Sequence, residues 1–520
     1  MANTDLFETR PGVPATDTVN EAGGRAYRMN AEHALAQLAA TGCFQNTFYT
    51  SAQDQLKTVL ALTEQVAPHF IAQTAVFARE KGFMKDMPAL LCAVLATRDP
   101  DLLVSTFARV IDNGRMVRNF VQMIRSGVTG RRSLGSRPKR LVRTWLAERD
   151  GEALVRDSVG NQPSLGDIIK MVHPVPTSPA REALYGYLIG REVDQSLLPE
   201  SLQDFERYKQ HRAGVVPKVP FQMLTALDLD RDAWTEIARN ASWTMTRMNL
   251  NTFHRHGVFE VKGMPELIAK RLANADLIRT SRVFPYQLLA AYLNVEPGIP
   301  RVIADALEHA MEISIDNVPR FEGRVAVLPD ISGSMGSPVT GYRHGATTKV
   351  KCVHVAALVA AAVLRRNPDA VVLPFDTRVV TLKLRGRDSV LTNARKLAIS
   401  GGGTDCSAPL RYMLHKDIRV DTAIFVSDNE SWFNGSHRHS YYQTTATAAM
   451  EAWNRYRTRN RGARLVCLDI QPNTTVQATG SADILNLGGF SDQSFTMIDG
   501  FVRGKGAQDY WVRQIKKIEV

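Results

Sequence analysis

The stretch Arg324–Met335, RVAVLPDISGSM, constrains the fold of this 520-residue chain more than any other. The apolar run Val325–Leu328, which contains two β-branched valines, predicts a buried strand, and Asp330, Ser332 and Ser334 follow it. Carboxylate and hydroxyl oxygens are ligands that hard cations prefer, and Mg²⁺ usually keeps several waters beside a few protein oxygens. The stretch therefore predicts part of an open Mg²⁺ site at the end of a strand. Because Pro329 lacks an N–H group, we expect the strand to end at Leu328.

Two later stretches supply further oxygen ligands. Gly401–Asp405, GGGTD, is a glycine turn that carries Thr404, and Thr422–Asp428, TAIFVSD, is a second buried strand that ends in an acid. In a parallel sheet the carboxyl ends of all strands meet at one edge, where ligands bind. We therefore expect Thr404 and Asp428 to join the first motif around one Mg²⁺, with Mn²⁺ as the alternative cation.

The second half of the chain alternates strands and helices, which predicts a doubly wound α/β sheet. Beyond the two strands above, the pattern predicts helices and strands at 349–365 (helix), 370–375 (strand), 379–384 (edge strand), 389–399 (helix), 442–457 (helix) and 464–470 (strand). Residues 474–499 are rich in Gly, Ser and Asp and are expected to form long loops with one short helix. The segment 510–520 is cationic and apolar, and it is expected to dock on the first half.

The first half is predicted to be helical, because apolar residues recur at three- and four-residue spacing. The predicted helices begin with Asn30–Gly42, which has an N-cap residue and a C-terminal glycine, and continue over 51–66, 69–81, 87–96 and 99–111. Helices of this length with short turns indicate a HEAT-like stack of helical pairs, and an irregular helical domain is the alternative. The predicted domains are 1–318 (helical), 319–500 (α/β) and 501–520 (tail).

Composition bounds the class of protein. With 44% apolar and 22% charged residues the chain is expected to be globular, and its length calls for two or more domains. Five scattered cysteines without a C-x-x-C pair argue against both a disulfide framework and a zinc site. No apolar run is long enough to span a bilayer, and the start has no secretory signal pattern, so a cytoplasmic location without membrane association is expected.

A basic run in the helical half points to an anionic partner. Between Arg115 and Arg143 the chain has nine cationic residues and no acid. A solvated helix usually mixes charges, so this imbalance favours an external anion such as phosphate, and the alternative is a merely solvated loop. The candidate nucleic-acid contacts in this run are Arg131, Arg132, Arg137, Lys139, Arg140 and Arg143.

The three C-terminal motifs, DISGSMG, GGTDC and SDNE, resemble the metal-ion-dependent adhesion site of von Willebrand factor A domains. An all-helical part followed by such a domain resembles the Ro protein family, whose helical module is called TROVE, in its bacterial form. The resemblance includes the opening NEAGGRAYRMNAEHALAQLAATGCFQNTFY, the helix end DIIKMVH, the segment TRMNLNTF and the later FPYQLLAAYLN.

This resemblance implies a closed ring of HEAT-like helical repeats that carries the α/β domain. Ro proteins bind small noncoding Y RNAs on a basic outer surface and single-stranded 3′ ends of misfolded or precursor RNA through a central hole. Bacterial members work with an exoribonuclease in RNA quality control. The resemblance adds Lys170, His173 and Arg247 to the candidate RNA contacts, although Val175 stands where the family often has a further lysine.

Three classes of function compete. An RNA-binding ribonucleoprotein component that acts as a monomer and is not an enzyme accounts for both halves. A metal-dependent adhesion or assembly module without RNA accounts for the second half and leaves the basic run unexplained. A metal-dependent hydrolase is the least favoured, because metal sites for phosphoryl chemistry usually offer several direct carboxylates and often two metals.

Overall fold

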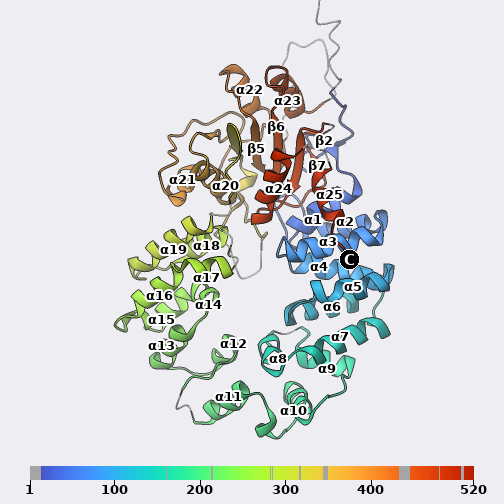
Figure 1. Ribbon diagram of the computed structural model, residues 1–520, viewed down its shortest axis with the longest axis vertical. Coiled ribbons are helices and arrows are strands. Elements are labelled where there is room, and N and C mark those ends of the chain that lie inside the picture. Colours follow the sequence, from blue (N-terminus) through green and yellow to red (C-terminus); the bar gives the residue numbers. More distant parts are fainter. Residues whose placement is uncertain are drawn as a thin grey trace, which may run out of the picture. The chain divides into compact units, whose positions relative to one another are not determined.

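The structure, a computed structural model, describes residues 13–160, 162–211, 215–281, 283, 285–315, 318–342, 349–431, 446–479, 481–504 and 509–520 (Figure 1). The chain forms two compact units. The α/β unit comprises Met1–Leu56 and Ile315–Gln514, and the helical unit comprises Lys57–Ser314 and Ile515–Val520. The predicted boundary at 318/319 lies close to the observed one at 314/315.

The sequence predicts that the N-terminal residues belong to the helical domain, but the described residues from 13 to 56 belong to the α/β unit. Strand β2 (Arg25–Arg28) pairs antiparallel with β7 (Thr475–Val476), and helix α1 (Ala31–Thr41) packs against strand β8 (Ile484–Gly488). A short strand β1 (Thr18–Val19) completes this three-stranded sheet. Sequence periodicity cannot detect such pairing, because it acts between segments more than 400 residues apart in the chain.

The C-terminal tail is divided between the two units within helix α25 (Tyr510–Lys516). Ile515–Val520 belong to the helical unit, where Gln73 donates hydrogen bonds of 2.8 and 2.9 Å to the carbonyls of Lys516 and Ile518. The final six residues thus dock on the helices, while the rest of the predicted tail belongs to the α/β unit.

A five-stranded parallel sheet forms the core of the α/β unit, in the order β4-β3-β5-β6-β8. Its remaining strands are β3 (Val325–Pro329), β4 (Val371–Val372), β5 (Thr422–Ser427) and β6 (Arg464–Asp469). The chain leaves β3 towards β4 on one side, whereas it leaves β5 towards β6 on the other. The carboxyl ends of β3 and β5 therefore form the topological switch point, where open α/β sheets bind their ligands.

Strand β3 continues through Pro329, so the expected end at Leu328 is wrong. Pro329 pairs with Val426 of β5, and the ladder extends to Asp330, whose N–H donates to the carbonyl of Val426 at 2.9 Å. The carbonyl of Pro329 accepts from Phe375 on the opposite side. The N–H group that Pro329 lacks would therefore face β4, which pairs with β3 only at Ala326 and Val327. The loss of one hydrogen bond at this end of the ladder costs little stability.

Two further expectations for the α/β part are wrong. Within the described residues, 379–384 form no strand and make only a single bridge between Phe375 and Val379. The region 474–499 contains the buried strand β8 and the twelve-residue helix α24 (Asp492–Arg503), not mainly loops. Strand β8 was missed because its apolar run, ILNLG, is short and is interrupted by Asn486.

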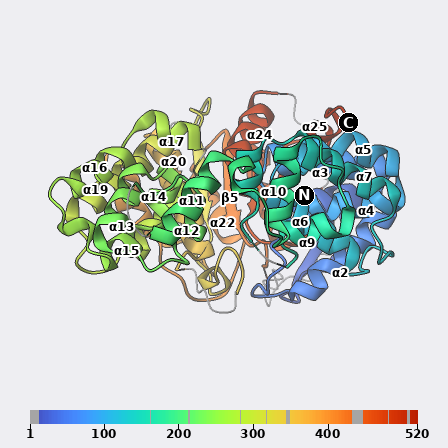
Figure 2. The same cartoon turned by 90° about the horizontal axis from the view of Figure 1, so that it is seen from below.

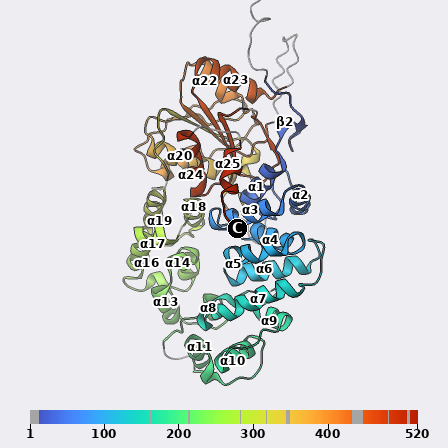
Figure 3. The same ribbon diagram turned by 45° about the vertical axis from the view of Figure 1, so that its right-hand side comes forward.

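Helices cover the sheet, as Figures 1 and 3 show, and the predicted alternation with strands is confirmed. Helix α20 contacts β3, β4 and β5, and α22 and α23 lie side by side. These helices are α20 (Cys352–Arg366), α21 (Val390–Leu397), α22 (Ala408–His415) and α23 (Ala448–Arg459), with a 3₁₀ turn η4 (Ser334–Gly336) after β3. The predicted start of the α23 helix at residue 442 lies outside the described residues.

The helical unit is entirely helical in its described part, as predicted. Its helices are α2 (Ala52–Gln65, which begins in the α/β unit), α3 (Pro68–Glu80), α4 (Asp86–Arg98), α5 (Pro100–Val110), α6 (Gly114–Arg125), α7 (Ser136–Glu148), α8 (Gly151–Asp157), α9 (Leu165–Val172), α10 (Pro179–Leu188), α11 (Glu200–His211), α12 (Phe221–Leu224), α13 (Arg231–Asn240), α14 (Trp243–Met248), α15 (Leu250–Arg255), α16 (Met264–Leu272), α17 (Ala275–Ser281), α18 (Pro285–Asn294) and α19 (Arg301–Ser314), with 3₁₀ helices η2 (Gln195–Leu197) and η3 (Val258–Glu260).

Packing in the helical unit joins helices that are close in the chain. Helix α4 is buried from Met87 to Ala96, and α3, α5 and α6 contact it. A helix that is apolar on all sides must be covered on all sides, which explains why these neighbours surround it. Figure 2 shows this part of the unit from below, where α4 contacts α6, and α9 contacts both α6 and α7.

Helix ends follow the predicted capping residues. The side chain of Asn30 accepts from the N–H of His33 at 2.8 Å, and that of Asp99 accepts from Leu102 at 3.0 Å at the start of α5. Both side chains satisfy N–H groups that a helix start leaves without partners. In the part of the chain that the structure describes, no helix has the length and apolar character needed to cross a membrane.

Candidate functional site

The five predicted cation ligands, here called the metal group, lie at or beside the switch point of the sheet. Asp330 follows β3, and Asp428 follows β5. Ser332 lies on the loop after β3, Ser334 is the first residue of η4, and Thr404 follows the glycine turn. All five are buried, with at most 5% of each residue exposed.

Backbone hydrogen bonds hold the loop after β3 against the glycine turn. The N–H of Gly401 donates to the carbonyl of Ile331 at 2.9 Å, and the N–H of Gly333 donates to the carbonyl of Gly402 at 3.0 Å. Gly402 has a φ of +76°, a conformation that glycine adopts without steric cost. The turn that carries Thr404 is thereby fixed beside the two serines.

The side chains of the metal group are linked to one another. The N–H of Ser332 donates to Oδ1 of Asp330 at 2.8 Å, and the hydroxyls of Ser332 and Ser334 lie 3.3 Å apart. A side-chain hydrogen bond also joins Ser334 to Asp428. The structure therefore brings together the first motif and the acid of the third, as the sequence predicts.

Burial makes the two acids of the metal group hard to ionise. Burial and the neighbouring Asp428 raise the pKa of Asp330 to about 7, and burial also raises the pKa of Asp428. Glu430, two residues further on, has its pKa raised to about 9 by burial and by Asp428. In the described residues, no lysine or arginine forms an ion pair with Asp330 or Asp428. A bound cation would supply the missing positive charge.

The donor set fits a hard cation. Three hydroxyls and two carboxylates are oxygen groups of the kind that Mg²⁺ or Mn²⁺ binds, and such an ion usually keeps waters at its remaining coordination positions. No group of three or more His, Cys, Asp or Glu side chains with a metal-site arrangement occurs among the described residues. A zinc-type centre is therefore not indicated there, and any cation at the metal group would depend on the hydroxyl oxygens.

Tyr49, which the sequence did not single out, also reaches the metal group. It lies between α1 and α2 and shares a side-chain hydrogen bond with Ser334. Burial and the carboxylates of the site raise its pKa to about 12, so its hydroxyl stays protonated. Tyr49 is the last residue of the N-terminal segment that carries the family resemblance, but no spacing in that segment pointed to a place at the metal group.

The basic run of the helical unit is less unbalanced in three dimensions than in the sequence. Arg115 pairs with Asp86 at 3.5 Å, and Arg137 pairs with Asp101 at 2.8 Å. Arg131 donates hydrogen bonds of 3.0 Å to the carbonyls of Ala96 and Ser133. Arg131 and Arg137 are therefore partly committed to the fold, because neighbouring helices supply acids and carbonyls that the run itself lacks.

Other cations of the run form one exposed surface with the end of α9. The side chain of Arg143 on α7 donates to the carbonyl of Val172, the last residue of α9. This surface, here called the α7–α9 surface, carries Lys139, Arg140, Arg143, Lys170 and His173, while Arg132 is exposed on the loop before α7, beside Gly127. None of these six forms an ion pair with an acid in the described part of the chain.

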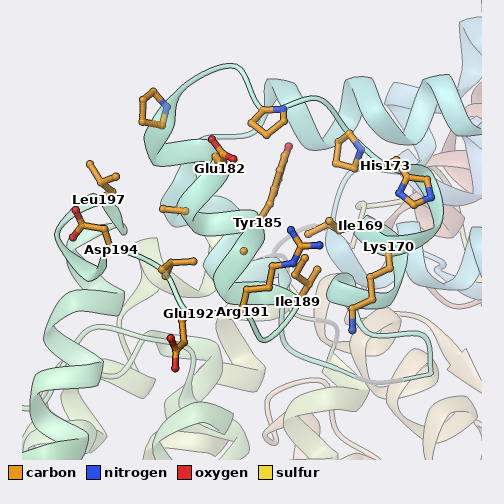
Figure 4. A pocket seen from close by; sticks show the side chains of 16 residues that line it. Ile169, Lys170, His173, Glu182, Tyr185, Ile189, Arg191, Glu192, Asp194 and Leu197 are labelled. Carbon is orange, nitrogen blue, oxygen red and sulfur yellow. The ribbon is translucent and has the colours of Figure 1, made fainter.

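Two pockets flank Lys170 on the α7–α9 surface. One has a volume of about 660 Å³, and Figure 4 shows Lys170, His173, Tyr185, Arg191, Glu192 and Asp194 among the side chains that line it. The other has a volume of about 410 Å³ and is lined by Arg125, Asp167 and Lys170, among others. Charged groups of both signs line the larger pocket, so it can accept both hydrogen-bond donors and acceptors.

Arg247 lies apart from the α7–α9 surface in the packing of the unit. It is on α14, which contacts α16, α17 and α18. Its guanidinium donates to the carbonyl of Gln287 at 2.9 Å, and burial lowers its pKa. Because Arg247 is half-buried and bonded to the backbone of α18, its position is that of a structural residue more than of an exposed phosphate contact.

Comparisons with known proteins bear on both units. Residues 324–502 match the family model described as the Ro60 vWA domain. The chain is 23% identical over 533 residues to the RNA-binding protein RO60 of Deinococcus radiodurans. This alignment covers 94% of this chain and 95% of that relative. It is 24% identical over 289 residues to the RNA-binding protein RO60 of Caenorhabditis elegans, in an alignment that covers 51% of this chain and 41% of that relative.

A solved structure shares the fold. The crystal structure of the Deinococcus radiodurans RO (RSR) protein aligns with a TM-score of 0.62 at 21% identity, covering 92% of this chain and 100% of that chain. The combination of a helical part and an α/β domain with a five-stranded parallel sheet is therefore that of a known architecture.

Proposed function

We propose that this chain is a member of the Ro family and an RNA-binding component of a small ribonucleoprotein, which its similarity to the Ro60 vWA domain and to an RNA-binding RO60 protein supports. The observation that supports this most is the α7–α9 surface. The hydrogen bond from Arg143 to the carbonyl of Val172 holds the basic face of α7 beside the end of α9, where Lys170 and His173 are exposed. Several cations on one surface that form no ion pair with an acid in the described residues are suited to a run of phosphates.

The pockets beside Lys170 extend the proposed grip from phosphates to bases. A volume of about 660 Å³ is within the range that accommodates small organic ligands, and an unstacked base needs both donors and acceptors along its edge. Glu192 and Asp194 supply acceptors there, while Lys170 and Arg191 supply donors. This combination favours RNA with unpaired nucleotides over uniform duplex.

The finer parts of the proposal follow the family resemblance. The RNA bound on the α7–α9 surface is a small noncoding Y-like RNA. The single-stranded 3′ ends of misfolded or precursor RNA are a second ligand, and an exoribonuclease is the enzyme partner. The chain acts as a monomer and binds RNA without catalysing a reaction, in quality control or processing.

The metal group serves a separate purpose in this proposal. Ser332, Ser334 and Thr404 would hold one Mg²⁺ or Mn²⁺ directly, with Asp330 and Asp428 beside it. The cation would supply an open coordination position for an anionic oxygen of a protein partner. A metal-dependent assembly module without RNA is the second candidate function, and the metal group is the observation that favours it.

A salt-dependent binding experiment tests the proposal. The RNA probe is a stem–loop with a single-stranded 3′ tail, and the variant carries Lys139→Gln, Arg140→Gln and Lys170→Gln. Each phosphate contact contributes about 0.7 to 0.9 to the slope of log K against log salt, so the slope should become shallower by roughly two. The matched control replaces Arg239, Lys262 and Lys270, three exposed cations of the same unit, with glutamine. Equal slopes for the two triple variants would contradict RNA binding at the α7–α9 surface.

A further inference from the structure

A second group of oxygen atoms lies next to the metal group, at the carboxyl end of β6. It consists of Asp469, the last residue of β6, with Gln471, Asn473 and Gln37 of α1. Each residue is at most 7% exposed. Within the described structure, no hydrogen-bond donor reaches Oδ1 of Asp469, Oε1 of Gln471, Oδ1 of Asn473 or Oε1 of Gln37. Such buried oxygens without partners are uncommon and call for an explanation.

Hydrogen bonds connect these residues into one cluster. Nδ2 of Asn473 lies 3.4 Å from Oδ2 of Asp469, and Nε2 of Gln37 lies 3.4 Å from the carbonyl of Gln471. Nε2 of Gln471 lies 2.8 Å from Sγ of Cys352. All three amides thus direct their N–H groups at protein acceptors, while their oxygens lie in the same cluster without a donor in the described residues.

The orientation of the Asn473 amide follows from its neighbours. Its Nδ2 also lies 3.3 Å from the carbonyl oxygen of Asp428. Rotating the amide by 180° would place its oxygen against that carbonyl and against the carboxylate of Asp469, where lone pairs would oppose one another. The oxygen of Asn473 is therefore held away from both.

Gly488 leaves room for the cluster on the adjacent strand. It is the register partner of Asp469 on β8, and paired residues of neighbouring strands face the same side of the sheet. A Cβ atom on Gly488 would lie 2.3 Å from Oε1 of Gln37, closer than atoms can approach. The absence of a side chain at Gly488 thus allows the Gln37 amide to lie beside the strand end that carries Asp469.

The chemistry of the cluster favours a cation over water. A single water donates only two hydrogens, which cannot satisfy four acceptor oxygens and does not balance a carboxylate. In the described residues no basic side chain forms an ion pair with Asp469. One carboxylate together with amide oxygens is a ligand set that Ca²⁺ accepts, since it takes six to eight oxygens including Asn and Gln carbonyls.

We propose that Asp469, Gln37, Gln471 and Asn473 form a second cation site, distinct from the metal group, for an oxygen-ligated hard cation of the Ca²⁺ type. Na⁺ and K⁺ share this oxygen chemistry, so the experiment must separate them from Ca²⁺. The site uses none of the side chains of the metal group. The two groups are neighbours, since Asn473 contacts the backbone carbonyl of Asp428.

The test uses the full chain, stripped with EDTA and titrated with CaCl₂ by calorimetry in the presence of excess Mg²⁺. The wild type is expected to bind one Ca²⁺ per chain and to gain thermal stability as it does. Asp330→Ala, which removes the metal group, should keep this binding. Asp469→Asn should weaken it by at least about 100-fold, and Gln37→Met, which removes one neutral ligand, by about tenfold. Repeating the thermal scans in KCl, NaCl and choline chloride shows whether a monovalent ion stabilises the protein in the same way.

Asp405→Asn provides the matched control, because Asp405 is an equally buried acid of the α/β unit that Arg411 neutralises at 2.6 Å. It should leave Ca²⁺ binding unchanged. If Asp469→Asn does not fold, Gln37→Met and the wild-type stoichiometry decide the question. The proposal is overturned if no cation changes the stability of the wild type, or if Asp469→Asn and Asp405→Asn respond to cations alike.

Discussion

The hydroxyl of Ser427 donates a hydrogen bond of 2.7 Å to Oδ2 of Asp330. Ser427 is the last residue of β5 and directly precedes Asp428, so the strand that supplies one acid of the metal group also orients the other. The second oxygen of Asp330 accepts from the N–H of Ser332. Both oxygens of the Asp330 carboxylate are therefore held by neutral donors, the hydroxyl of Ser427 and the N–H of Ser332.

Ser427→Ala tests the importance of that orientation. We expect the affinity of the metal group for Mn²⁺ to fall about 10- to 100-fold, as is usual when a group that orients a metal ligand is removed. Calorimetric titration of the EDTA-treated protein measures the change. Ser494→Ala, at another buried serine of the α/β unit, serves as the control and should bind Mn²⁺ as the wild type does. Equal affinities for the two variants would show that the hydroxyl of Ser427 does not orient a ligand.

Asp330→Ala tests whether the two units have separate tasks. We expect the variant to lose Mn²⁺ binding while its affinity for the stem–loop RNA stays within about 0.5 kcal/mol of the wild type, as is usual for distant sites. Gel-shift titration at constant salt measures the RNA affinity. A tenfold loss of RNA binding by a folded Asp330→Ala variant would instead place the cation on the path of the RNA.

Arg131 and Arg140 should respond differently to truncation, although they belong to the same basic run. Arg131→Ala removes hydrogen bonds to Ala96 and Ser133 and should lower the free energy of unfolding by about 1 to 2 kcal/mol. Arg140 is exposed, so Arg140→Ala should change stability by less than about 0.5 kcal/mol and lower RNA affinity instead. Thermal scans and gel shifts on both variants measure the two effects. The distinction fails if both variants lose stability equally.

The stability of the α/β unit should depend on pH through His33. Burial lowers the pKa of His33 from 6.5 to about 4, so the unfolded chain binds a proton between these values that the native state does not. The contribution of His33 is complete above pH 6.5 and is lost as the pH falls towards 4, a total of about 3 kcal/mol.

His33→Gln isolates this contribution from that of the buried acids, whose raised pKa values change the stability with pH in the opposite sense. The wild type should lose stability relative to the variant as the pH falls from 6.5 to 4. Denaturant unfolding followed by tryptophan fluorescence measures the difference, since the ring of Trp511 packs edge-on against that of His33, with the ring centroids 5.7 Å apart. A constant difference across this range would show that His33 titrates alike in both states.

The sequence by itself determined the position of the metal group. Apolar β-branched runs that end in Asp330 and Asp428 define strand ends, and a parallel sheet brings such ends to one edge whatever else the chain does. The same local logic predicted the helix starts at Asn30 and Asp99, because capping depends on residues only a few positions apart.

Only the tertiary structure decided which charges and oxygens have partners. Asp101 neutralises Arg137, and Gln37 reaches the strand end of Asp469, because helices and strands distant in the chain pack together. The assignment of residues 1–56 to the α/β unit has the same origin. Periodicity and capping act over a few residues, whereas the pairing of buried charges depends on contacts between distant segments, which a single sequence does not encode in any local pattern.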